Sequence, residues 1–548
     1  MSFLDDIFAS LASAGDTPVL QEIREGTVRP VSARKLLELV ARARAFLHTR
    51  GLTPGLRCAL YAQNGVSWVA LDLAAMAEGL IVVPLYARQA PAELAAMMKD
   101  CSPTLICCGD KALRDGLVKE WPAAPPMFLF EEIFATAPAD YQKPQTAGSD
   151  PVTIIYTSGT SGEAKGVILT AGNIGHMLKC VNARLDLLMA GKSGRDRVFH
   201  YLPFVFAGSW MLLLTSLLRA SLLTINTDLG KIAQDMRTVA PDYFLNVPAL
   251  LERMRRAVDE QLWQAGGLVQ TIYARAKAGW MRKHEGRSQL LDSFWLSLAN
   301  SAIFPTIRKK MIGRNLRALI CGSAPLAVET QLFFMMLGIP VLQSYGLTET
   351  TAICTLDDPR HYVPGRVGPA IAGIEMKLGD CEEILVRGPN VFPGYWNRPE
   401  ETARVLREGW FHTGDQGEVD ATGNWKIVGR IKNLIILGSG HNIAPEPIEE
   451  KLAQHLPAGA QAVLVGNGKG YLSAIITGPV TREQAQRAID AVNPQFPHYK
   501  QVRAFHLRPE AFTVENGFLT ANGKLKRDRI AREMGNEIEE MYRIRMAG

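Results

Sequence analysis

The sequence predicts an α/β protein with a large N-terminal domain of mixed, mainly parallel sheets covered by helices and a small α+β C-terminal domain. Its 548 residues exceed what one hydrophobic core normally supports, so at least two domains are expected. In the first part of the chain, short strand-like runs alternate with amphipathic helical patterns, which is typical of parallel sheets covered by helices. The pattern changes near residue 431, so we place the domains at 1–430 and 431–548.

The composition is that of an ordinary globular enzyme, with 47% hydrophobic and 21% charged residues. The 60 basic and 54 acidic residues give a net charge of +6, which is too mild and too dispersed to indicate nucleic-acid binding. The eight cysteines form no CxxC pair, so reduced thiols in a cytosolic protein fit best. The N-terminus lacks a signal-peptide pattern, and no apolar run approaches the roughly 20 residues of a membrane span. We therefore expect a cytoplasmic protein without a transmembrane segment.

The elements before residue 150 follow from capping signals and hydrophobic spacing. Ser32 caps a helical pattern that ends at Gly51, with apolar residues three to four positions apart. The pattern then predicts a strand at 57–62, a helix at 68–77, a strand at 80–86, a helix at 91–99 and a strand at 104–108. A linker rich in proline and alanine, 122–150, leads into the next motif.

The most informative stretch runs from Ile154 to Leu169, where two apolar β-leaning runs flank a loop of small residues. The loop offers glycines that let several N–H groups point at one anion, together with hydroxyl donors and one mobile positive charge. Its candidate ligand-binding residues are Thr157, Ser158, Gly159, Thr160, Ser161, Gly162 and Lys165. This set of donors and positive charge is suited to binding a polyphosphate. The alternative interpretation is a flexible turn in a hairpin. The spacing excludes a Walker A loop, because Lys165 follows Gly162 by three residues and precedes Gly166.

The same stretch resembles the phosphate loop of the adenylate-forming superfamily, which includes acyl-CoA synthetases, non-ribosomal peptide adenylation domains and firefly luciferase. One position departs from the family pattern: Ala164 stands where a proline usually precedes the lysine. The resemblance implies that the loop and Lys165 hold the β- and γ-phosphates of ATP.

The segment after this loop is where the resemblance places the acyl site. Residues 197–206 are predicted as a strand, and 210–218 as an apolar helix. Phe206 stands where many acyl-CoA synthetases have a histidine, and this apolar replacement suits an apolar substrate. Trp210 is a candidate gate or wall of the same pocket. Plain core packing is the alternative for either residue. Residues 241–248 resemble the family segment that brings a strand beside the acyl tunnel.

Residues 253–314 are basic and helical and carry Trp263, Trp280 and Trp295. This region resembles the long-chain acyl-CoA synthetase branch more than adenylation domains. Basic charge with interfacial aromatics favours contact with an anionic membrane surface, and a solvated helical face is the simpler interpretation.

Two predicted strands, 316–321 and 341–344, each end in a loop of chemically useful residues. Loops at the carboxyl ends of parallel strands are where α/β folds build sites. Tyr345 offers an aromatic face for a purine, Thr348 a hydroxyl for a phosphate, and Glu349 a hard oxygen ligand for Mg²⁺. Taken singly, they also fit a common turn or a helix N-terminal charge. The resemblance adds the remaining adenine-side residues, with Ser323 in place of a frequent glycine: Gly322, Ser323, Ala324, Pro325 and Gly346.

Two further motifs, 411–415 and 429–433, follow in the order the family has them. Asp415 suits both ribose hydroxyls, since a fixed carboxylate accepts two hydrogen bonds. Arg430 is placed to reach the ribose or the α-phosphate, although a loop salt bridge is an alternative for either residue. Lys432 falls at the family's hinge, where a polar residue absorbs the rotation between the domains. Asn433 replaces the usual acidic residue, which leaves its pairing open.

The C-terminal domain is predicted from a strand at 434–437, a glycine turn at 438–442, a helix at 445–455, strands near 462–465 and 472–476, and a helix capped by Thr481. The resemblance implies that this domain is a mobile lid. It also implies that the turn with Gly440 and His441 contacts the pantetheine of coenzyme A, His441 being a turn residue rather than a base. The loop 519–527 resembles the family's threonine–x–x–glycine–lysine motif, so Lys524 is the expected catalytic lysine. Lys526 is the nearest competitor, and an exposed lysine-rich loop is the alternative.

Together these motifs predict an AMP-forming acid–thiol ligase that uses ATP, Mg²⁺ and coenzyme A. A carboxylate attacks the α-phosphate to give an acyl-adenylate and pyrophosphate, and a thiol then takes the acyl group and releases AMP. Two anions must meet, so the site needs positive charge and positioned donors rather than a base. The expected acid is a medium- or long-chain fatty acid, with an aryl or other acid as an alternative. A carrier protein's phosphopantetheine is the rival acceptor, and a catalytically silent homologue is the other alternative. Oligomeric state and contact with the inner membrane surface stay open.

Overall fold

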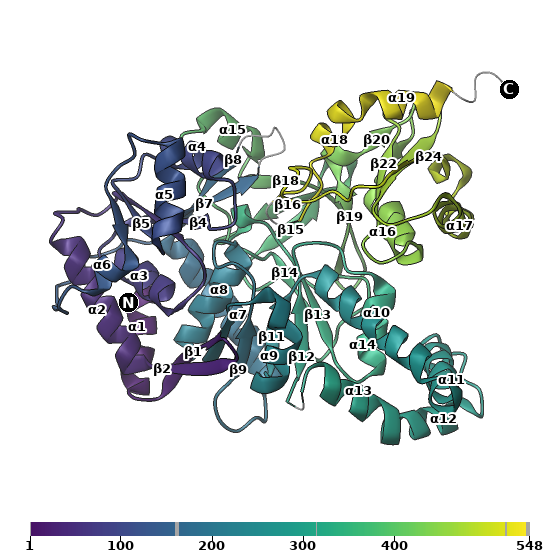
Figure 1. Cartoon of the computed structure of the whole chain (residues 1–548), viewed down its shortest axis with the longest axis horizontal. Helices are drawn as coiled ribbons and strands as arrows, with labels where there is room; N and C mark the ends of the chain where they lie inside the picture. Colours follow the sequence, from purple (N-terminus) through teal and green to yellow (C-terminus); the bar gives the residue numbers. More distant parts are fainter. Residues whose placement is uncertain (1, 159–163, 314, 521–522, 544–548) are drawn as a thin grey trace.

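The computed structural model describes residues 2–158, 164–313, 315–520 and 523–543. In Figure 1 the N-terminal part fills the left and centre, the chain after residue 431 lies at the upper right, and the helices that follow residue 248 lie at the lower right. Of the predicted site residues, Gly159, Thr160, Ser161 and Gly162 lie outside the described residues. No helix within the described ranges combines the length and the apolar character that crossing a bilayer needs.

The first of two large sheets has the strand order β6-β5-β3-β4-β7-β8 and is parallel except for the β7–β8 hairpin. Because side chains alternate along a strand, Ala59 and Tyr61 of β3 pack in the outer core with α4 and α5, while Cys58 and Leu60 face the inner helices. The elements are β3 (Arg57–Ala62), β4 (Ile81–Tyr86), α4 (Pro91–Cys101), β5 (Leu105–Cys108), α5 (Lys111–Glu120), β6 (Met127–Leu129), α6 (Phe130–Phe134), β7 (Pro151–Ser158) and β8 (Ala164–Thr170).

The second large sheet has the order β14-β13-β12-β11-β9-β10-β1-β2, with antiparallel pairs only at its two ends. Its strands are β1 (Pro18–Arg24), β2 (Thr27–Ser32), β9 (Arg197–His200), β10 (Leu222–Asn226), β11 (Tyr243–Asn246), β12 (Ala318–Cys321), β13 (Val341–Tyr345) and β14 (Thr355–Leu356). Five helices share a core with both large sheets: α1 (Phe3–Ala14), α2 (Ala33–His48), α3 (Val66–Ala77), α7 (Ala171–Met189) and α8 (Ala207–Leu218).

The outer face of the second sheet is covered by helices that lie from the lower centre to the lower right of Figure 1. They are α9 (Ile232–Val239), α10 (Pro248–Ala265), α11 (Gly267–His284), α12 (Asp292–Leu298), the π-helix η2 (Ala299–Ile303), α13 (Phe304–Met311) and α14 (Val328–Met336). Half-buried Trp280 and Trp295 pack against this core. Most of the described part of the region 253–313 is helical, as predicted, with a turn at 285–291. The side chain of Trp263 lies outside the described residues.

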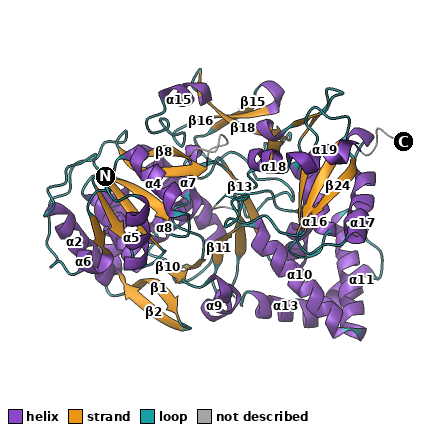
Figure 2. Cartoon of the chain, turned by 45° about the horizontal axis from the view of Figure 1, so that its top comes forward, coloured by secondary structure: helices purple, strands orange, loops and turns teal. Residues whose placement is uncertain are grey.

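A third, antiparallel sheet lies at the top of Figure 2 and has the order β15-β16-β18-β17, with β19 paired to β18. Its elements are β15 (Glu375–Leu378), β16 (Glu383–Arg387), α15 (Pro399–Val405), β17 (Leu406–Arg407), β18 (Trp410–Val419) and β19 (Trp425–Arg430). Short 3₁₀ helices connect elements here and elsewhere: η1 (Leu229–Lys231), η3 (Thr348–Thr350), η4 (Asp380–Glu382), η5 (Ile431–Asn433), η6 (Asn493–Gln495) and η7 (His498–Lys500).

The chain after residue 431 builds apolar cores from its own residues alone. A sheet in the order β22-β23-β24 is flanked by helices, and β20 pairs with β21. The elements are β20 (Ile435–Ile436), β21 (Asn442–Ile443), α16 (Glu446–His455), β22 (Gln461–Val465), β23 (Leu472–Thr477), α17 (Arg482–Val492), β24 (Val502–Arg508), α18 (Arg527–Glu533) and α19 (Gly535–Arg543). Ser32 and Thr481 cap α2 and α17 as predicted, each accepting a backbone N–H.

The predicted strand 197–206 is too long, because β9 ends at His200. Pro203 has no N–H to donate to a neighbouring strand. The side chain of Asn64 instead hydrogen-bonds to backbone groups of this segment. It donates to the Leu202 carbonyl at 2.7 Å and accepts from the Phe204 N–H at 2.9 Å. The segment therefore leaves the sheet and turns into α8.

Candidate active site

Several of the predicted nucleotide-site residues lie close together where the loop after β13 meets the β18–β19 strands and the segment after β16 that contacts the β7–β8 hairpin. Tyr345 is the last residue of β13, and Asp415 and Arg430 are register partners on β18 and β19. These positions lie far apart in the chain, so the sheets bring them together.

Asp415 is the centre of a buried hydrogen-bonded group. Its Oδ2 accepts from the Tyr345 hydroxyl at 2.8 Å, and its Oδ1 lies 2.7 Å from Nε of Arg430. Burial opposes the charge on Arg430, but Asp415 and further negative groups outweigh it and raise the pKa of Arg430. Burial, reinforced by Asp415, holds the pKa of Tyr345 well above its usual range. The group therefore presents a fixed carboxylate and a fixed cation beside an aromatic ring.

The backbone of β18 is bent where it carries Asp415. Gly414 has a φ of +68°, a left-handed conformation that favours glycine. Its N–H donates to Oε1 of Glu383 at 2.9 Å, and the other oxygen of Glu383 lies 2.8 Å from Nδ1 of His412. The Thr413 hydroxyl also anchors the bend, donating to the Ile384 carbonyl at 2.8 Å. These contacts hold the direction of the Asp415 carboxylate.

Glu349 lies in η3, directly after β13, and is held by a tyrosine from another part of the chain. Its Oε1 accepts from the Tyr395 hydroxyl at 2.9 Å, and its backbone carbonyl accepts from the Phe392 N–H at 2.9 Å. Burial, together with the charge of Glu349, raises the pKa of Tyr395, which keeps this hydroxyl a donor. A carboxylate fixed in this way is a suitable hard-oxygen ligand for Mg²⁺.

Lys165 lies at the start of β8, opposite Thr157 in the β7–β8 hairpin. Its Nζ forms an ion pair with Oε2 of Glu401 on α15 and lies 5.2 Å from the centre of the Tyr395 ring. The hairpin is docked against the segment that carries Tyr395, since the Trp396 N–H donates to the Gly166 carbonyl at 2.7 Å. The structure thus places Lys165 and Glu349 next to the same tyrosine.

Two glycines let the loops after β12 and β13 approach their neighbours. A Cβ on Gly322 would lie 2.7 Å from Oγ of Ser344, and a Cβ on Gly346 would collide with the backbone of Ala352 and Ile353. Ser323, next to Gly322, adopts a φ of +74°, where a glycine would be less strained. Ala324 and Pro325 complete this loop.

Lys524 is an exposed residue of the C-terminal domain that lies close enough to Arg430, Asp415 and Glu349 for their charges to act on it. The loop that carries it is closed by Thr520, whose N–H donates to the Lys524 carbonyl at 2.8 Å and whose hydroxyl accepts from the Lys524 N–H at 3.1 Å. The protein around the ammonium group, and then the positive charge of Arg430, lower the pKa of Lys524, against the attraction of Asp415 and Glu349. Lys526 points elsewhere, with its Nζ 3.8 Å from Glu93 of α4.

Lys432 adds a third positive charge to this cluster. It lies in η5, between β19 and the C-terminal domain. The surrounding protein, and then Arg430, lower the pKa of Lys432 to about 8. Its neighbour Asn433, whose pairing the sequence left open, donates to Oε1 of Glu446 on α16 at 2.7 Å.

The glycine turn 438–442 is exposed and carries an aromatic pair. His441 stacks on Tyr499 with the ring centres 4.3 Å apart, and Oγ of Ser439 lies 2.9 Å from Nδ1 of His441. Gly440 has a φ of +81°, as a tight turn requires. Lys500 lies beside the stack, with its Nζ 5.8 Å from the Tyr499 ring centre.

The two predicted acyl-pocket residues lie at the start of α8. Phe206 precedes the first residue of the helix and is half-buried, with its ring 6.0 Å from that of Tyr86. Trp210 is 2% exposed, and its Nε1 donates to Oδ2 of Asp72 on α3 at 2.8 Å. The indole of Trp210 is thus anchored in the core between two helices, which is the packing arrangement that the sequence left as the alternative.

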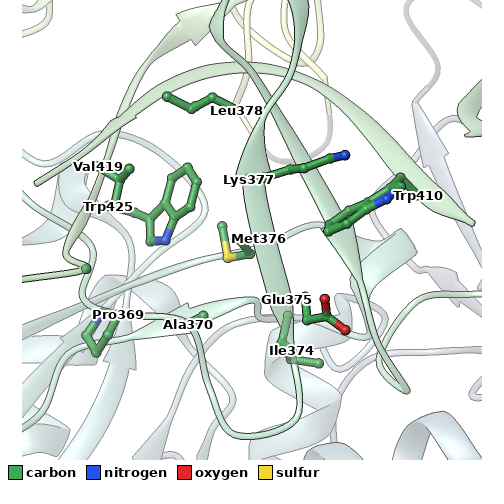
Figure 3. Close-up of a pocket in the computed structure, with 11 residues that line it drawn as sticks. Pro369, Ala370, Ile374, Glu375, Met376, Lys377, Leu378, Trp410, Val419 and Trp425 are labelled. Atoms are coloured by element: carbon green, nitrogen blue, oxygen red, sulfur yellow. The ribbon is translucent and has the colours of Figure 1, made fainter.

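A groove of about 860 Å³ lies on the third sheet, beside the edge strand β15 (Figure 3). Trp410 borders it, covered by Lys377 and Arg387 at 4.3 and 4.5 Å from its ring. Among the residues that the structure describes, its lining includes none of the predicted site residues: it consists of Pro369, Ala370, Ile374, Glu375, Met376, Lys377, Leu378, Trp410, Val419, Gly423 and Trp425. The groove is therefore separate from the cluster around Asp415.

Comparison with known families identifies the class of protein. The family described as "AMP-binding enzyme" matches residues 8–396, and the family described as "AMP-binding enzyme C-terminal domain" matches residues 432–545. The chain belongs to the AMP-binding enzyme family. It is therefore an adenylate-forming enzyme and an AMP-forming acid–thiol ligase, as its motifs predict, and its aligned relatives include proteins named long-chain-fatty-acid–CoA ligases.

Individual members of the family align over most of the chain. The long-chain-fatty-acid–CoA ligase FadD15 of Mycobacterium bovis is 25% identical, covering 96% of this chain and 94% of its own. Human long-chain-fatty-acid–CoA ligase 6 is 28% identical over 89% of this chain and 78% of its own. The structure of o-succinylbenzoate coenzyme A synthetase from Bacillus subtilis, in complex with ATP and magnesium ion, superposes with a TM-score of 0.72 over 95% of this chain and 98% of that one, at 20% identity. The last similarity shows the shared fold.

Sequence reasoning missed two residues of this family member's site. Tyr395 holds Glu349 and lies beside Lys165, and Glu401 forms the ion pair with Lys165. Both come from the segment after β16, far from the motifs they contact. The only local signal is the sequence Pro-Gly-Tyr-Trp-Asn-Arg-Pro at 393–399, which indicates a turn but no partner.

Proposed function

We propose that the chain joins a medium- or long-chain fatty acid to coenzyme A through an acyl-adenylate. The observation that carries the proposal is the arrival of Lys524 beside Arg430, Asp415 and Glu349. Desolvation by the surrounding protein, and then the positive charge of Arg430, lower the pKa values of Lys524 and Lys432, so positive charges are crowded here. An anion such as a triphosphate or a carboxylate would relieve this crowding, so the cluster suits the meeting of two anions.

The adenosine of ATP would lie beside Tyr345, with the backbone of 322–325 and Gly346 close to the ring. The close packing at Gly322 and Gly346 supports this placement. A side chain at either position would collide with neighbouring residues, so only glycine lets these loops lie so close to them. The ribose hydroxyls would donate to Asp415, whose carboxylate has further acceptor capacity beside its bonds to Tyr345 and Arg430. Arg430 would face the ribose or the α-phosphate.

Lys165 would leave its ion pair with Glu401 and bind the β- and γ-phosphates. The hydroxyls and N–H groups of 157–162 would donate to the same phosphates, with the Thr348 hydroxyl nearby. The donors fit Mg²⁺, since Tyr395 fixes a carboxylate oxygen of Glu349 on the side of the cluster that Lys165 borders. When bound, Mg²⁺ would neutralise charge on the phosphate oxygens.

In the first step a carboxylate oxygen of the acid would attack the α-phosphorus, and the bond to the pyrophosphate oxygen would break. No proton moves, so the step needs charge stabilisation rather than a base. Lys524, with Arg430 beside it, would attract both anions and stabilise the charge that builds on the α-phosphate. Lys526 is engaged with Glu93 and serves as an internal comparison.

In the second step the C-terminal domain, residues 431–548, would rotate about Lys432 and bring the turn with Gly440 and His441 to the core. The thiolate of coenzyme A would attack the acyl carbonyl carbon, forming a thioester and releasing AMP. The His441–Tyr499 stack and Lys500 offer an aromatic face and a positive charge at this turn. That chemistry favours the nucleotide of free coenzyme A over a carrier protein, which remains the alternative acceptor.

Two observations favour a fatty acid as the substrate. The names of the aligned ligases from Mycobacterium bovis and human favour a long-chain fatty acid. The apolar helix α8, with Phe206 where the family often has histidine, favours an apolar chain as well. The name of the Bacillus subtilis synthetase points to an aryl acid, which is the alternative substrate class.

The test is pyrophosphate release from ATP and Mg²⁺ with a panel of fatty and aryl acids, with and without coenzyme A. We expect turnover to peak on fatty acids and to require coenzyme A. Lys524→Ala should abolish pyrophosphate release, while the matched variant Lys526→Ala should retain it. A single burst without turnover on adding coenzyme A would indicate a carrier protein. Absence of pyrophosphate with every acid, or full activity in Lys524→Ala, would overturn the proposal.

A further inference from the structure

The excess positive charge of the chain is concentrated in one group of helices. Residues 267–311, which form α11, α12, η2 and α13, contain eight Lys or Arg and two Asp or Glu. Their formal charge of +6 equals that of the whole chain, so the remaining residues are balanced. In Figure 1 these helices form the lower right end of the molecule, on the far side from the N-terminus.

The turn between α11 and α12, together with the first turn of α12, exposes large apolar side chains at this end. Leu290 is 100% exposed, Leu291 66% and Phe294 58%. We call these three residues the apolar tip. Single exposed apolar residues are ordinary, but three within five positions of one turn are a feature of interaction sites.

The turn that presents the apolar tip is held in place. Buried Asp292 binds the Arg282 guanidinium with both oxygens and also accepts from the Gln289 N–H at 2.8 Å. Gly279 lies directly beneath, and a Cβ there would be 3.0 Å from Oδ1 of Asp292. The outward direction of Leu290 is therefore built into the packing rather than being a consequence of a loose loop.

Aromatic and basic residues flank the tip along the chain. His284 stacks on half-buried Trp280 at 5.1 Å, and Phe294 lies edge-on to half-buried Trp295 at 5.2 Å. Exposed Lys283, His284 and Arg287 lie in the last turn of α11 and just beyond it, with Glu285 3.7 Å from Arg287; we call the three basic residues the basic collar. Apolar side chains next to aromatic and basic ones match the layers of a bilayer surface, where apolar groups enter the acyl region and cations meet the headgroups.

We propose that the apolar tip and the basic collar dock on an anionic lipid bilayer. The positive charge of this face favours an anionic bilayer over a second copy of the chain, because two copies of the face would bring like charges together. The tip would insert among the headgroups and the collar would face anionic phosphates. The proposal does not depend on which acid the site uses, since none of these residues belongs to the cluster around Asp415.

The experiment is sedimentation of the full chain with vesicles of phosphatidylcholine, and of phosphatidylcholine mixed with phosphatidylglycerol. We expect binding to the anionic vesicles that weakens with added salt. Leu290→Ser/Leu291→Ser/Phe294→Ser should reduce the partition coefficient at least about tenfold, through lost apolar burial. Lys283→Glu/Arg287→Glu should do the same, at about 1 kcal/mol for each lost basic charge, while leaving pyrophosphate release on a soluble acid unchanged.

Control variants replace the same number of exposed residues elsewhere. Val118→Ser/Leu229→Ser/Leu378→Ser removes three apolar side chains that are 44%, 41% and 38% exposed, and Lys111→Glu/Lys119→Glu reverses two charges on α5. These controls should bind like the unaltered chain. The proposal is wrong if anionic vesicles bind no better than neutral ones, if the tip variant binds like its control, or if the tip variant instead abolishes dimers detected by light scattering.

Discussion

Asp72 shows how one buried carboxyl group affects the stability of this protein. It is 1% exposed and accepts a hydrogen bond from the Trp210 indole. Burial, which that hydrogen bond only partly offsets, raises the pKa of Asp72 from 3.8 to about 7. In the unfolded chain the group ionises at its ordinary pKa, whereas the folded protein keeps it protonated. The free energy of unfolding therefore falls as the pH rises between these two values and levels off above about 7, with a total effect of up to about 4 kcal/mol.

Asp72→Asn should remove this pH dependence. The amide keeps an acceptor for Trp210 and never ionises, so the variant should gain stability relative to the unaltered chain as the pH rises from about 5 to about 8. Its new N–H₂ group costs about 1–3 kcal/mol at every pH if it finds no partner, so the difference between the two pH values is the informative quantity. Denaturant melts at both pH values measure it. Asp115→Asn, at a side chain that is 51% exposed, is the control, and an equal shift in both variants would contradict the prediction.

Tyr395 is the residue through which the phosphate side of the site is positioned. Tyr395→Phe removes the hydroxyl that donates to Glu349 while keeping the ring beside Lys165. A hydrogen bond to a charged group contributes about 1.5–3 kcal/mol, so we expect the Mg²⁺ concentration for half-maximal pyrophosphate release to rise about tenfold or more. Tyr243→Phe removes a comparable bond, 3.2 Å from the Tyr243 hydroxyl to Asp196 in the core, and should leave the Mg²⁺ dependence unchanged. Equal Mg²⁺ curves for Tyr395→Phe and the unaltered chain would show that Glu349 needs no such support.

At the scale of residues, sequence reasoning found groups whose chemistry is local and missed groups that act through tertiary contact. Asp415 and Arg430 were expected from two separate motifs, and the structure pairs them as register neighbours. Tyr395 and Glu401 reach the site only because the segment after β16 pairs with β8, as the Ile168 N–H donating to the Gly394 carbonyl shows. No spacing rule connects positions more than two hundred residues apart, so that contact was not predictable.

At the scale of elements, the loop after β13 depends on one glycine. Gly346 lies between Tyr345 and Thr348, and a Cβ there would collide with the backbone of Ala352 and Ile353. Backbone atoms cannot rotate aside, so Gly346→Ala should displace the loop and raise the KM for ATP at least about tenfold. Gly470→Ala, in open space, should change nothing. Steady-state pyrophosphate release over a range of ATP concentrations measures both, and an unaltered KM in a folded Gly346→Ala protein would contradict the prediction.

Element boundaries were predictable where side-chain periodicity and caps agree, as for β3 and for the helix that Ser32 begins. They failed at 201–206, where an apolar run looked like a strand. That failure has a physical cause, since Asn64 and Pro203 remove the backbone groups that a sheet would use. The hairpin of β1 and β2 and the last helices, α18 and α19, carried no distinctive pattern, and their packing partners come from elsewhere in the chain.

At the scale of the whole molecule, the C-terminal domain is held against the core by a few polar contacts. Lys451 pairs with Glu329 of α14 at 2.6 Å, and Arg256 of α10 donates to the Ala453 carbonyl at 2.9 Å. These two interactions hold the orientation in which Lys524 lies near Arg430. If the domain rotates during turnover as proposed, these contacts must break in every cycle, so their strength sets how long this orientation lasts.

Glu450 makes that orientation sensitive to pH. It lies on α16 with Lys451, near Glu252 of α10 and Glu329 of α14, and Arg255 and Arg256 of α10 act in turn on those two carboxylates. Burial, and then the charges of Glu252 and Glu329, raise the pKa of Glu450 from 4.5 to about 7, against the attraction of Lys451. In the rotated orientation the group is expected to be solvated and to regain its ordinary pKa. The docked orientation should therefore weaken as the pH rises from about 4.5 to about 7, and no further above that.

Glu450→Gln should flatten this dependence, because the amide is neutral at every pH. We expect the single-turnover rate of pyrophosphate release, which needs the docked orientation, to fall less in the variant than in the unaltered chain as the pH rises from about 5 to about 7. Glu483→Gln, at an exposed position of α17, is the matched control and should follow the unaltered profile.

Thioester formation would use the other orientation of the domain. Glu450→Gln should therefore slow coenzyme A-dependent turnover at about pH 8, where the unaltered protein releases the domain more readily. Identical profiles for Glu450→Gln and Glu483→Gln would mean that the contact is too weak to bias the domain, and that Lys451 and Arg256 set its orientation without Glu450.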